Sequence, residues 1–289
     1  RLAQSLTPEK LPHILRMATI NAATRFDLRD RGALAPGYLA DLALYPDLKT
    51  WAPKKVWKNG RLVVDGQYVG PSPTQETPLE KRLLNSVRLA PLDKNSLKVP
   101  ATGAKVRVIG LIPGQIVTDS LILSWPAQNG FYEASPEEDI IKMAVWNRYG
   151  GDGRARVGFL KGLKLTKGAL AQTISHDSHH LVAAGLNDED IILAARKVID
   201  LGGGLAIAAE GQVLGSLALP LGGLLSDAPA RDIARSLEDL ERVGLKLGWP
   251  PGFDPFLTLG FMSLEVIPRL KLTVVGLMED FEIKELVLP

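Results

Sequence analysis

The apolar residues of this chain form short segments that change between helical and strand periodicity in irregular order. Such a mixture favours an α+β fold over a Rossmann-like sheet, in which strands and helices alternate regularly. The longest apolar run, residues 215–225, is much shorter than the ~20 residues that a membrane-spanning helix needs. We therefore expect a compact α+β chain without a membrane-spanning segment.

The first 70 residues predict a helix followed by a small β-structure. Thr7-Pro8-Glu9 has the pattern of a helix start, and apolar residues at helical spacing continue to Ala23, so we expect one amphipathic helix. A turn rich in glycine and proline then precedes an apolar strand at residues 40–45. The Asn59-Gly60 pair between two short strands predicts a hairpin. Because the chain starts without Met and inside helical sequence, we expect a segment upstream of it.

Prolines at 71, 73 and 78, with Ser and Thr between them, predict an exposed linker at residues 71–82. Beyond it, residues 83–289 are expected to form a second domain in which strands and helices are mixed. Two apolar runs, 168–175 and 181–185, flank a polar segment and predict two strands joined through it. Further elements are expected as strands at 106–111, 116–123 and 139–149, a helix after Asn187, a hairpin at Glu210-Gly211 and a charged helix at 229–248.

The residue counts exclude several classes of site. The chain has no cysteine, so it can form no disulfide, no thiolate metal site and no cysteine nucleophile. This absence is typical of a cytoplasmic protein. Lys and Arg number 34 against 32 Asp and Glu, and no basic block occurs, so we expect binding to neither nucleic acid nor a membrane surface.

Three of the four histidines fall within five residues, at His176, His179 and His180. Together with Asp177, His176 and His179 offer three ligands for divalent Zn, Mn or Fe, beside the hydroxyl of Ser178. The alternative is a plain strand connection in which Asp177 and Ser178 bond to local backbone amides and the histidines lie at the surface. Spacing alone favours this alternative, because the segment matches no metal motif of fixed offsets.

Two parts of the first 70 residues resemble the end of barrels of the amidohydrolase superfamily. The matching segments are residues 17–23 and 32–43, followed by the hairpin at Lys58-Asn59-Gly60. In that superfamily the last helix of the barrel leads into a small β-domain. The resemblance implies that residues 1–25 are the last helix of a truncated (β/α)8 barrel and that residues 26–70 belong to the small β-domain.

The remaining motifs resemble, in order, the C-terminal domain of microbial adenine deaminases. The resemblance implies a functional loop made of His176, Asp177, Ser178 and His179 that faces the active-site mouth of the barrel. His180 is left out of this set, because the family usually has Asn there. The motifs are Val157–Leu163, Gly168–His179, Leu201–Leu205, Leu219–Asp227, Pro255–Leu259 and Val266–Thr273.

The resemblance to adenine deaminases implies hydrolysis of adenine to hypoxanthine and ammonia by a hydroxide bound to a divalent metal, Mn or Fe. The expected barrel ligands include a His-x-His pair, which this chain lacks, and His13 outside the loop is expected to be a helix-surface or packing histidine. We therefore expect the chain to be inactive alone, to need the upstream amidohydrolase barrel as its partner and to associate as a homo-oligomer. The alternative is a noncatalytic purine- or partner-binding module derived from a deaminase.

Overall fold

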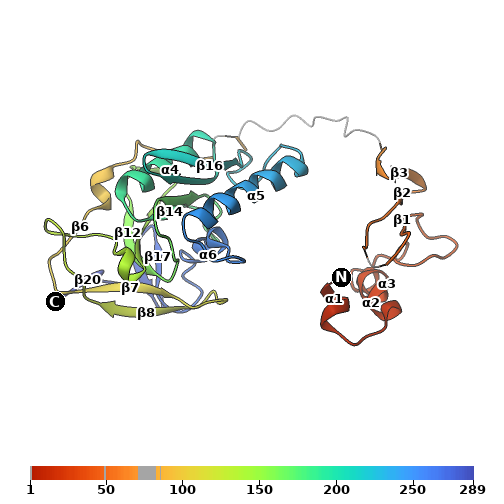
Figure 1. Cartoon of the computed structure of the whole chain (residues 1–289), viewed down its shortest axis with the longest axis horizontal. Helices are drawn as coiled ribbons and strands as arrows, with labels where there is room; N and C mark the ends of the chain where they lie inside the picture. Colours follow the sequence, from red (N-terminus) through yellow and green to blue (C-terminus); the bar gives the residue numbers. More distant parts are fainter. Residues whose placement is uncertain (1, 49, 71–82, 85) are drawn as a thin grey trace. The chain divides into compact units, whose positions relative to one another are not determined.

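The computed structural model describes residues 2–48, 50–70, 83–84 and 86–289. The chain divides into two compact units, Arg1–Pro78 and Leu79–Pro289, which are described separately below (Figure 1). The linker predicted at residues 71–82 lies outside the described residues. Within the described part, no helix combines the length and the apolar character needed to cross a membrane.

The first unit contains short helices followed by a four-stranded sheet of order β1-β2-β3-β4. The hairpin predicted at Asn59-Gly60 is confirmed: it joins β2 to β3, and both residues have positive φ, as a tight two-residue turn requires. The elements are α1 (Leu2–Leu6), α2 (Leu11–Ala18), α3 (Ile20–Arg25), β1 (Leu42–Leu44), β2 (Lys55–Lys58), β3 (Arg61–Asp65) and β4 (Gln67–Tyr68).

The single helix expected from Thr7 to Ala23 is wrong in its start and its continuity. Helix α2 begins only at Leu11, with Pro12 in its first turn. At Thr19 the backbone leaves the helical conformation, and the Thr19 hydroxyl donates a hydrogen bond to the Leu15 carbonyl at 2.7 Å. Threonine competes with the backbone for such carbonyls, and it is followed by β-branched Ile20, so the helix breaks here.

The second unit is built on a sheet to which nine described strands contribute, in the order β16-β15-β13-β14-β10-β12-β7-β20, with β8 also paired to β7. Every pairing is antiparallel except that of β12 with β7. This mostly antiparallel sheet with separate helices confirms the α+β class. The strands are β7 (Lys105–Leu111), β8 (Thr118–Leu123), β10 (Ile140–Trp146), β12 (Arg156–Lys161), β13 (Ala169–Gln172), β14 (Leu181–Gly185), β15 (Gly204–Ala209), β16 (Gln212–Ala218) and β20 (Val287–Leu288).

Helices and smaller strands surround this sheet (Figure 1). The short strands pair as β17-β18-β19, β11-β5 and β6-β9. The remaining elements of the unit are α4 (Asp188–Asp200), α5 (Ala230–Lys246), α6 (Pro255–Phe261), the 3-10 turns η1 (Lys94–Leu97) and η2 (Pro136–Glu138), β5 (Arg88–Leu89), β6 (Val99–Pro100), β9 (Phe131–Tyr132), β11 (Tyr149–Gly151), β17 (Lys271–Thr273), β18 (Gly276–Glu279) and β19 (Glu282–Lys284).

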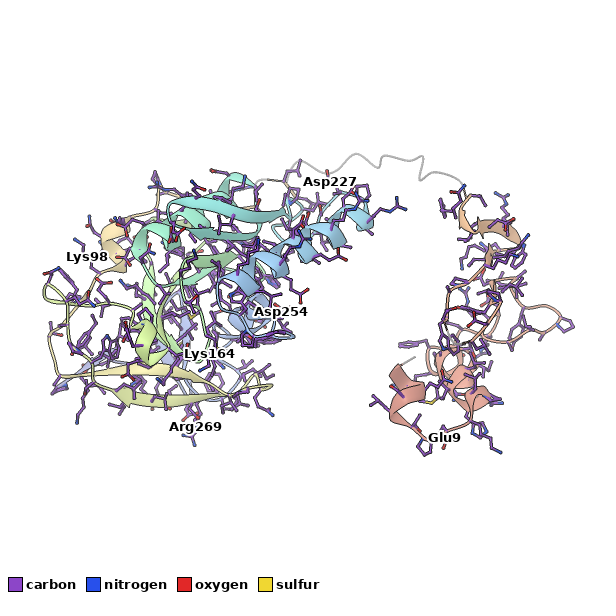
Figure 2. All side chains as sticks on the ribbon, in the orientation of Figure 1. Glu9, Lys98, Lys164, Asp227, Asp254 and Arg269 are labelled. Carbon is purple, nitrogen blue, oxygen red and sulfur yellow. The ribbon has the colours of Figure 1, made fainter. Side chains whose placement is uncertain are left out.

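Successive residues of the central strands face two different cores. On β10, Met143 and Val145 pack with residues of α5 and α6, whereas Ala144 and Trp146 pack with residues of α4. The face toward α4 is rich in alanine, which allows a helix to lie close to the strands. Figure 2 shows the side chains that fill these layers. Because both faces are covered, β10, β13, β14 and β15 are buried along their whole length.

Candidate active-site loop and the adjoining pocket

The segment from His176 to His179 lies between β13 and β14, which confirms the two strands predicted to be joined through it. The structure adds that these strands pair with each other in antiparallel register. His176 and His179 are half-buried, while Asp177 and Ser178 are exposed. Among the described residues, the side chains of Asp177 and Ser178 make none of the backbone hydrogen bonds that Asx or Ser turns would provide. Contacts with neighbouring elements hold the loop in place instead.

Helix α6 holds the first half of the loop. The His176 amide donates to the Gly260 carbonyl at 2.8 Å. The His176 ring stacks on the Phe261 ring, with centroids 4.7 Å apart and planes 20° from parallel. Just before the loop, the Ser175 hydroxyl hydrogen-bonds to that of Ser263, and both residues are buried. Backbone and side chain of His176 are therefore both fixed against residues 260–261.

Two residues that follow β10 hold the second half of the loop. The Tyr149 hydroxyl donates to the Ser178 carbonyl at 3.0 Å. Arg148, which is 2% exposed, donates to the Tyr149 hydroxyl at 3.0 Å and to the Gly222 carbonyl at 2.9 Å. Its guanidinium also lies 4.8 Å from the centroid of the Tyr149 ring. Arg148 thus ties the loop to the segment after β16.

The two later histidines occupy surroundings that disfavour a positive charge. Burial lowers the pKa of His179, and nearby His176 and Arg148 lower it further. Burial also lowers the pKa of His180, with a smaller contribution from Arg148. Within the described part of the chain, the buried Nδ1 atoms of both rings have no hydrogen-bond partner. These surroundings favour the neutral form of both imidazoles, in which one ring nitrogen donates a hydrogen bond and the other accepts one.

The residues of the loop do not form a metal centre by themselves. His176, Asp177 and His179 are the possible ligands offered by the sequence, but no group of three or more His, Asp or Glu among the described residues is placed to hold a metal ion. His176 and His179 do contact each other, with ring centroids 5.8 Å apart.

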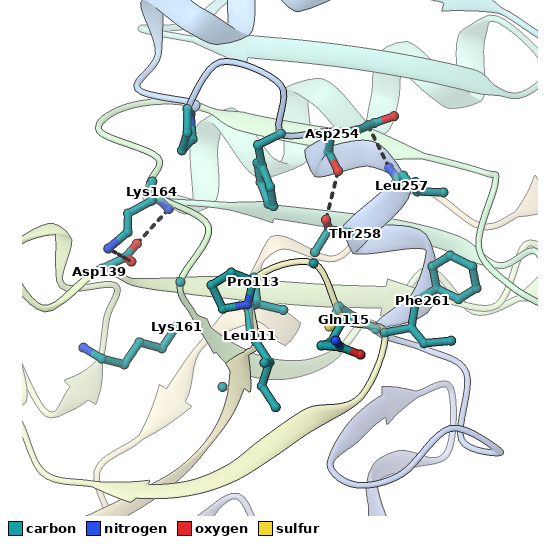
Figure 3. A pocket seen from close by; sticks show the side chains of 18 of the residues that line it. Leu111, Pro113, Gln115, Asp139, Lys161, Lys164, Asp254, Leu257, Thr258 and Phe261 are labelled. Carbon is teal, nitrogen blue, oxygen red and sulfur yellow. Dashed lines mark hydrogen bonds and ion pairs between the residues drawn. The ribbon is translucent and has the colours of Figure 1, made fainter. Parts of the chain in front are cut away.

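A pocket of about 800 Å³ lies beside α6 (Figure 3). The pocket is lined mainly by residues from three segments: 110–121, the turn after β12, and 250–262. Phe261 is one of these lining residues. Lys164 and Asp254, both labelled in Figure 2, contribute to separate walls. Lys164 pairs with Asp139 at 3.0 Å, while Asp254 accepts the Leu257 amide at 2.9 Å and caps α6. Helix α6 therefore borders both the pocket and the loop.

Sequence reasoning identified the loop but missed the residues that hold it. Arg148 and Tyr149 carry no motif, and an arginine in sequence is expected at the surface. Gly260 and Phe261 lie just beyond one of the motifs, but nothing in their spacing indicates a contact with His176. These partners are distant in sequence, so only the folded chain brings them together.

Residues 115–282 match the family model of the adenine deaminase C-terminal domain, and residues 5–63 match that of the amidohydrolase family. The chain is 48% identical over 270 residues to adenine deaminase 2 of Carboxydothermus hydrogenoformans, covering 93% of this chain and 47% of that protein. It is 44% identical over 271 residues to adenine deaminase of Oleidesulfovibrio alaskensis, with 93% and 46% covered. For adenine deaminase of Lysinibacillus sphaericus the identity is 38% over 279 residues, with 96% and 47% covered. The chain thus spans about half the length of these curated relatives.

Proposed function

The chain belongs to the adenine deaminase family, and we propose that it is the C-terminal part of an enzyme that hydrolyses adenine to hypoxanthine and ammonia. The observation that carries this proposal is the match of residues 115–282 to the adenine deaminase C-terminal domain, the part of the chain that contains the loop. Relatives that are named adenine deaminases and are 38–48% identical support the same substrate.

The first unit buries few apolar side chains, which supports a barrel as its partner. Among the described residues 2–70, Ile14 and Ala23 are the buried hydrophobic residues. Leu6, Phe26 and Leu34 are 75%, 74% and 87% exposed. A unit with so little core is stable only when its apolar side chains are covered by further protein. The rest of an amidohydrolase barrel would provide that cover.

In this proposal the chemistry is divided between two parts of the enzyme. The divalent metal, Mn or Fe, belongs to the barrel, where it supplies the hydroxide. His176, Asp177, Ser178 and His179 complete the mouth of the site, and the neutral imidazole of His179 is suited to hydrogen-bond a purine ring. The cytoplasmic location and the homo-oligomeric state expected from the sequence remain predictions.

The proposal is tested with the complete reading frame, expressed and supplied with Mn. We expect that protein to release ammonia from adenine, and the present chain alone to show no turnover. A complete protein that folds and binds Mn but leaves adenine intact would refute the assignment. Turnover by the present chain alone would refute the division of chemistry between its parts.

The alternative is a noncatalytic purine- or partner-binding role for the loop. It is favoured by one observation, that the described residues include no set able to hold a metal. In the complete enzyme, His176→Ala and His179→Ala separate the two roles, and His13→Ala is a matched control because His13 is exposed and pairs with Glu9 on the first unit. Loss of activity in the loop variants alone supports the proposed function, while full activity in all three supports the alternative.

A further inference from the structure

We propose that Phe261 is a positioning residue, which sets the orientation of the His176 imidazole within the loop. This inference rests on the proposed function, because it assigns to Phe261 a part in the same site. Phe261 does not itself act on substrate in this account. It acts through the ring with which it stacks.

The contacts of His176 leave its ring dependent on this stack. Among the described residues, the imidazole contacts the rings of Phe261 and His179 and makes no hydrogen bond. Its peptide amide is held by the Gly260 carbonyl at 2.8 Å, which fixes the backbone but leaves the side chain free to rotate. A near-parallel stack between two aromatic rings favours one rotamer of the histidine side chain. The aromatic face of Phe261 therefore orients the His176 ring.

Helix α6 is rigid enough to serve this purpose. The Gln172 side-chain amide donates to the Phe256 carbonyl at 2.7 Å, and Gln172 is buried at the end of β13. Gly260 lies so close to the segment that follows β13 that a Cβ there would stand 2.9 Å from the Ile174 carbonyl oxygen. Phe256 packs edge-on against Trp249, with centroids 5.7 Å apart. These contacts hold Phe261 at a constant distance from the loop.

The surroundings of Phe261 make it suitable for substitution. Phe261 is half-buried and lines the pocket beside α6, so a shorter side chain there does not leave a closed void. Phe261→Leu keeps the side chain apolar and removes its aromatic face, whereas Phe261→Tyr keeps that face. Leu257→Ala, on the same helix and with its side chain exposed, is the matched control for a general effect on α6.

The first experiment uses the present chain and records the His176 ring protons by NMR. The stacked ring of Phe261 should shift these protons upfield, so Phe261→Leu should return them toward the position of a free histidine, whereas Phe261→Tyr and Leu257→Ala should not. Gly260→Ala should also alter the shifts, because the added methyl group forces α6 away from the Ile174 carbonyl. His176 shifts that are unchanged in Phe261→Leu overturn the proposal.

The second experiment measures adenine deamination by the complete enzyme. Misplacing a contributing group costs up to about a hundredfold in rate, so we expect Phe261→Leu to lower kcat/KM by about tenfold, with Phe261→Tyr close to wild type. In a His176→Ala background, Phe261→Leu should cause no further loss, because both changes remove the same oriented ring. Independent, multiplicative losses overturn the proposal. If the wild-type complete enzyme does not act on adenine, the proposed function fails, and the NMR comparison still tests the stack.

Discussion

At the scale of single residues, Lys271 on β17 is a fully buried cation that faces neutral oxygens. Its ammonium donates to the Ile116 carbonyl at 2.9 Å and lies 3.5 Å from the Thr118 hydroxyl. Burial lowers its pKa to about 8 from 10.5. The unfolded chain therefore binds more protons than the folded one between pH 8 and 10.5, so the free energy of unfolding should rise with pH in that window.

The direction of this pH dependence leads to a prediction for the variant Lys271→Met. Methionine has a similar length and no charge to bury, so we expect the variant to be more stable than wild type at pH 7, by about 1–3 kcal/mol. The advantage should shrink as the pH rises from 8 to 10.5, where wild-type Lys271 becomes neutral without cost. Urea unfolding of both proteins from pH 7 to pH 10.5 measures this difference in the free energy of unfolding. Lys246→Met serves as the control, because Lys246 is exposed. A stability difference that does not change with pH would rule out this account.

Single residues also mark the limit of what the sequence could predict. The histidine cluster is visible as a local count, and its place between two strands was predicted correctly. The pairing of those strands with each other was not predicted. The burial of Lys271 and Arg148 was not predicted, because the sequence around a basic residue gives no sign of the carbonyl groups that surround its side chain in the fold. Those carbonyls come from segments far along the chain, such as Gly222 for Arg148.

At the scale of elements, Asp190 joins the start of α4 to the turn between β15 and β16. Its buried carboxylate accepts the amides of Glu210 at 3.2 Å and Gly211 at 3.0 Å, and the side-chain amide of Asn187 at 2.8 Å. Hydrogen bonds to a charged group stabilise by about 1.5–3 kcal/mol each. Asp190→Ala should therefore lower the free energy of unfolding by at least about 2 kcal/mol, measured by urea unfolding.

The control for this prediction lies at the other end of the same helix. Asp200 is exposed on the last turn of α4, where a negative charge opposes the helix dipole. Asp200→Ala should leave stability unchanged or raise it slightly, although it removes the same charge. Equal losses in the two variants would mean that charge or helix propensity, rather than the hydrogen bonds of Asp190, sets the cost.

Elements were predictable where their ends carry local signals. Helix α4 has Asn187 as its N-cap, with a side chain that accepts the Asp190 amide, and the Glu210-Gly211 turn has positive φ at both residues. Helix α6 has a similar signal in the cap Asp254 followed by proline, which the sequence interpretation did not use. The break at Thr19 had no comparable marker, because threonine also occurs inside helices.

At the scale of the whole molecule, the two units differ in how much core they contain. The second unit buries three hydrophobic clusters, two of which cover opposite faces of its sheet. The first unit buries Ile14 and Ala23 among its described hydrophobic residues and leaves side chains such as Leu34 exposed. Because apolar burial provides most of the stability of a domain, the second unit should fold alone, and the first should not.

Amide hydrogen exchange on the present chain tests this difference directly. We expect slow exchange in β10, β13 and β14 and fast exchange in α2 and α3, because an element without a core opens at little cost in free energy. A fragment of residues 83–289 should keep the urea midpoint of the present chain, since the first unit contributes little to it. If a longer protein contains the barrel proposed above, α2 and α3 should become protected there. Strong protection of α2 and α3 in the present chain would contradict the prediction, and it would also remove the main structural support for the barrel proposed above.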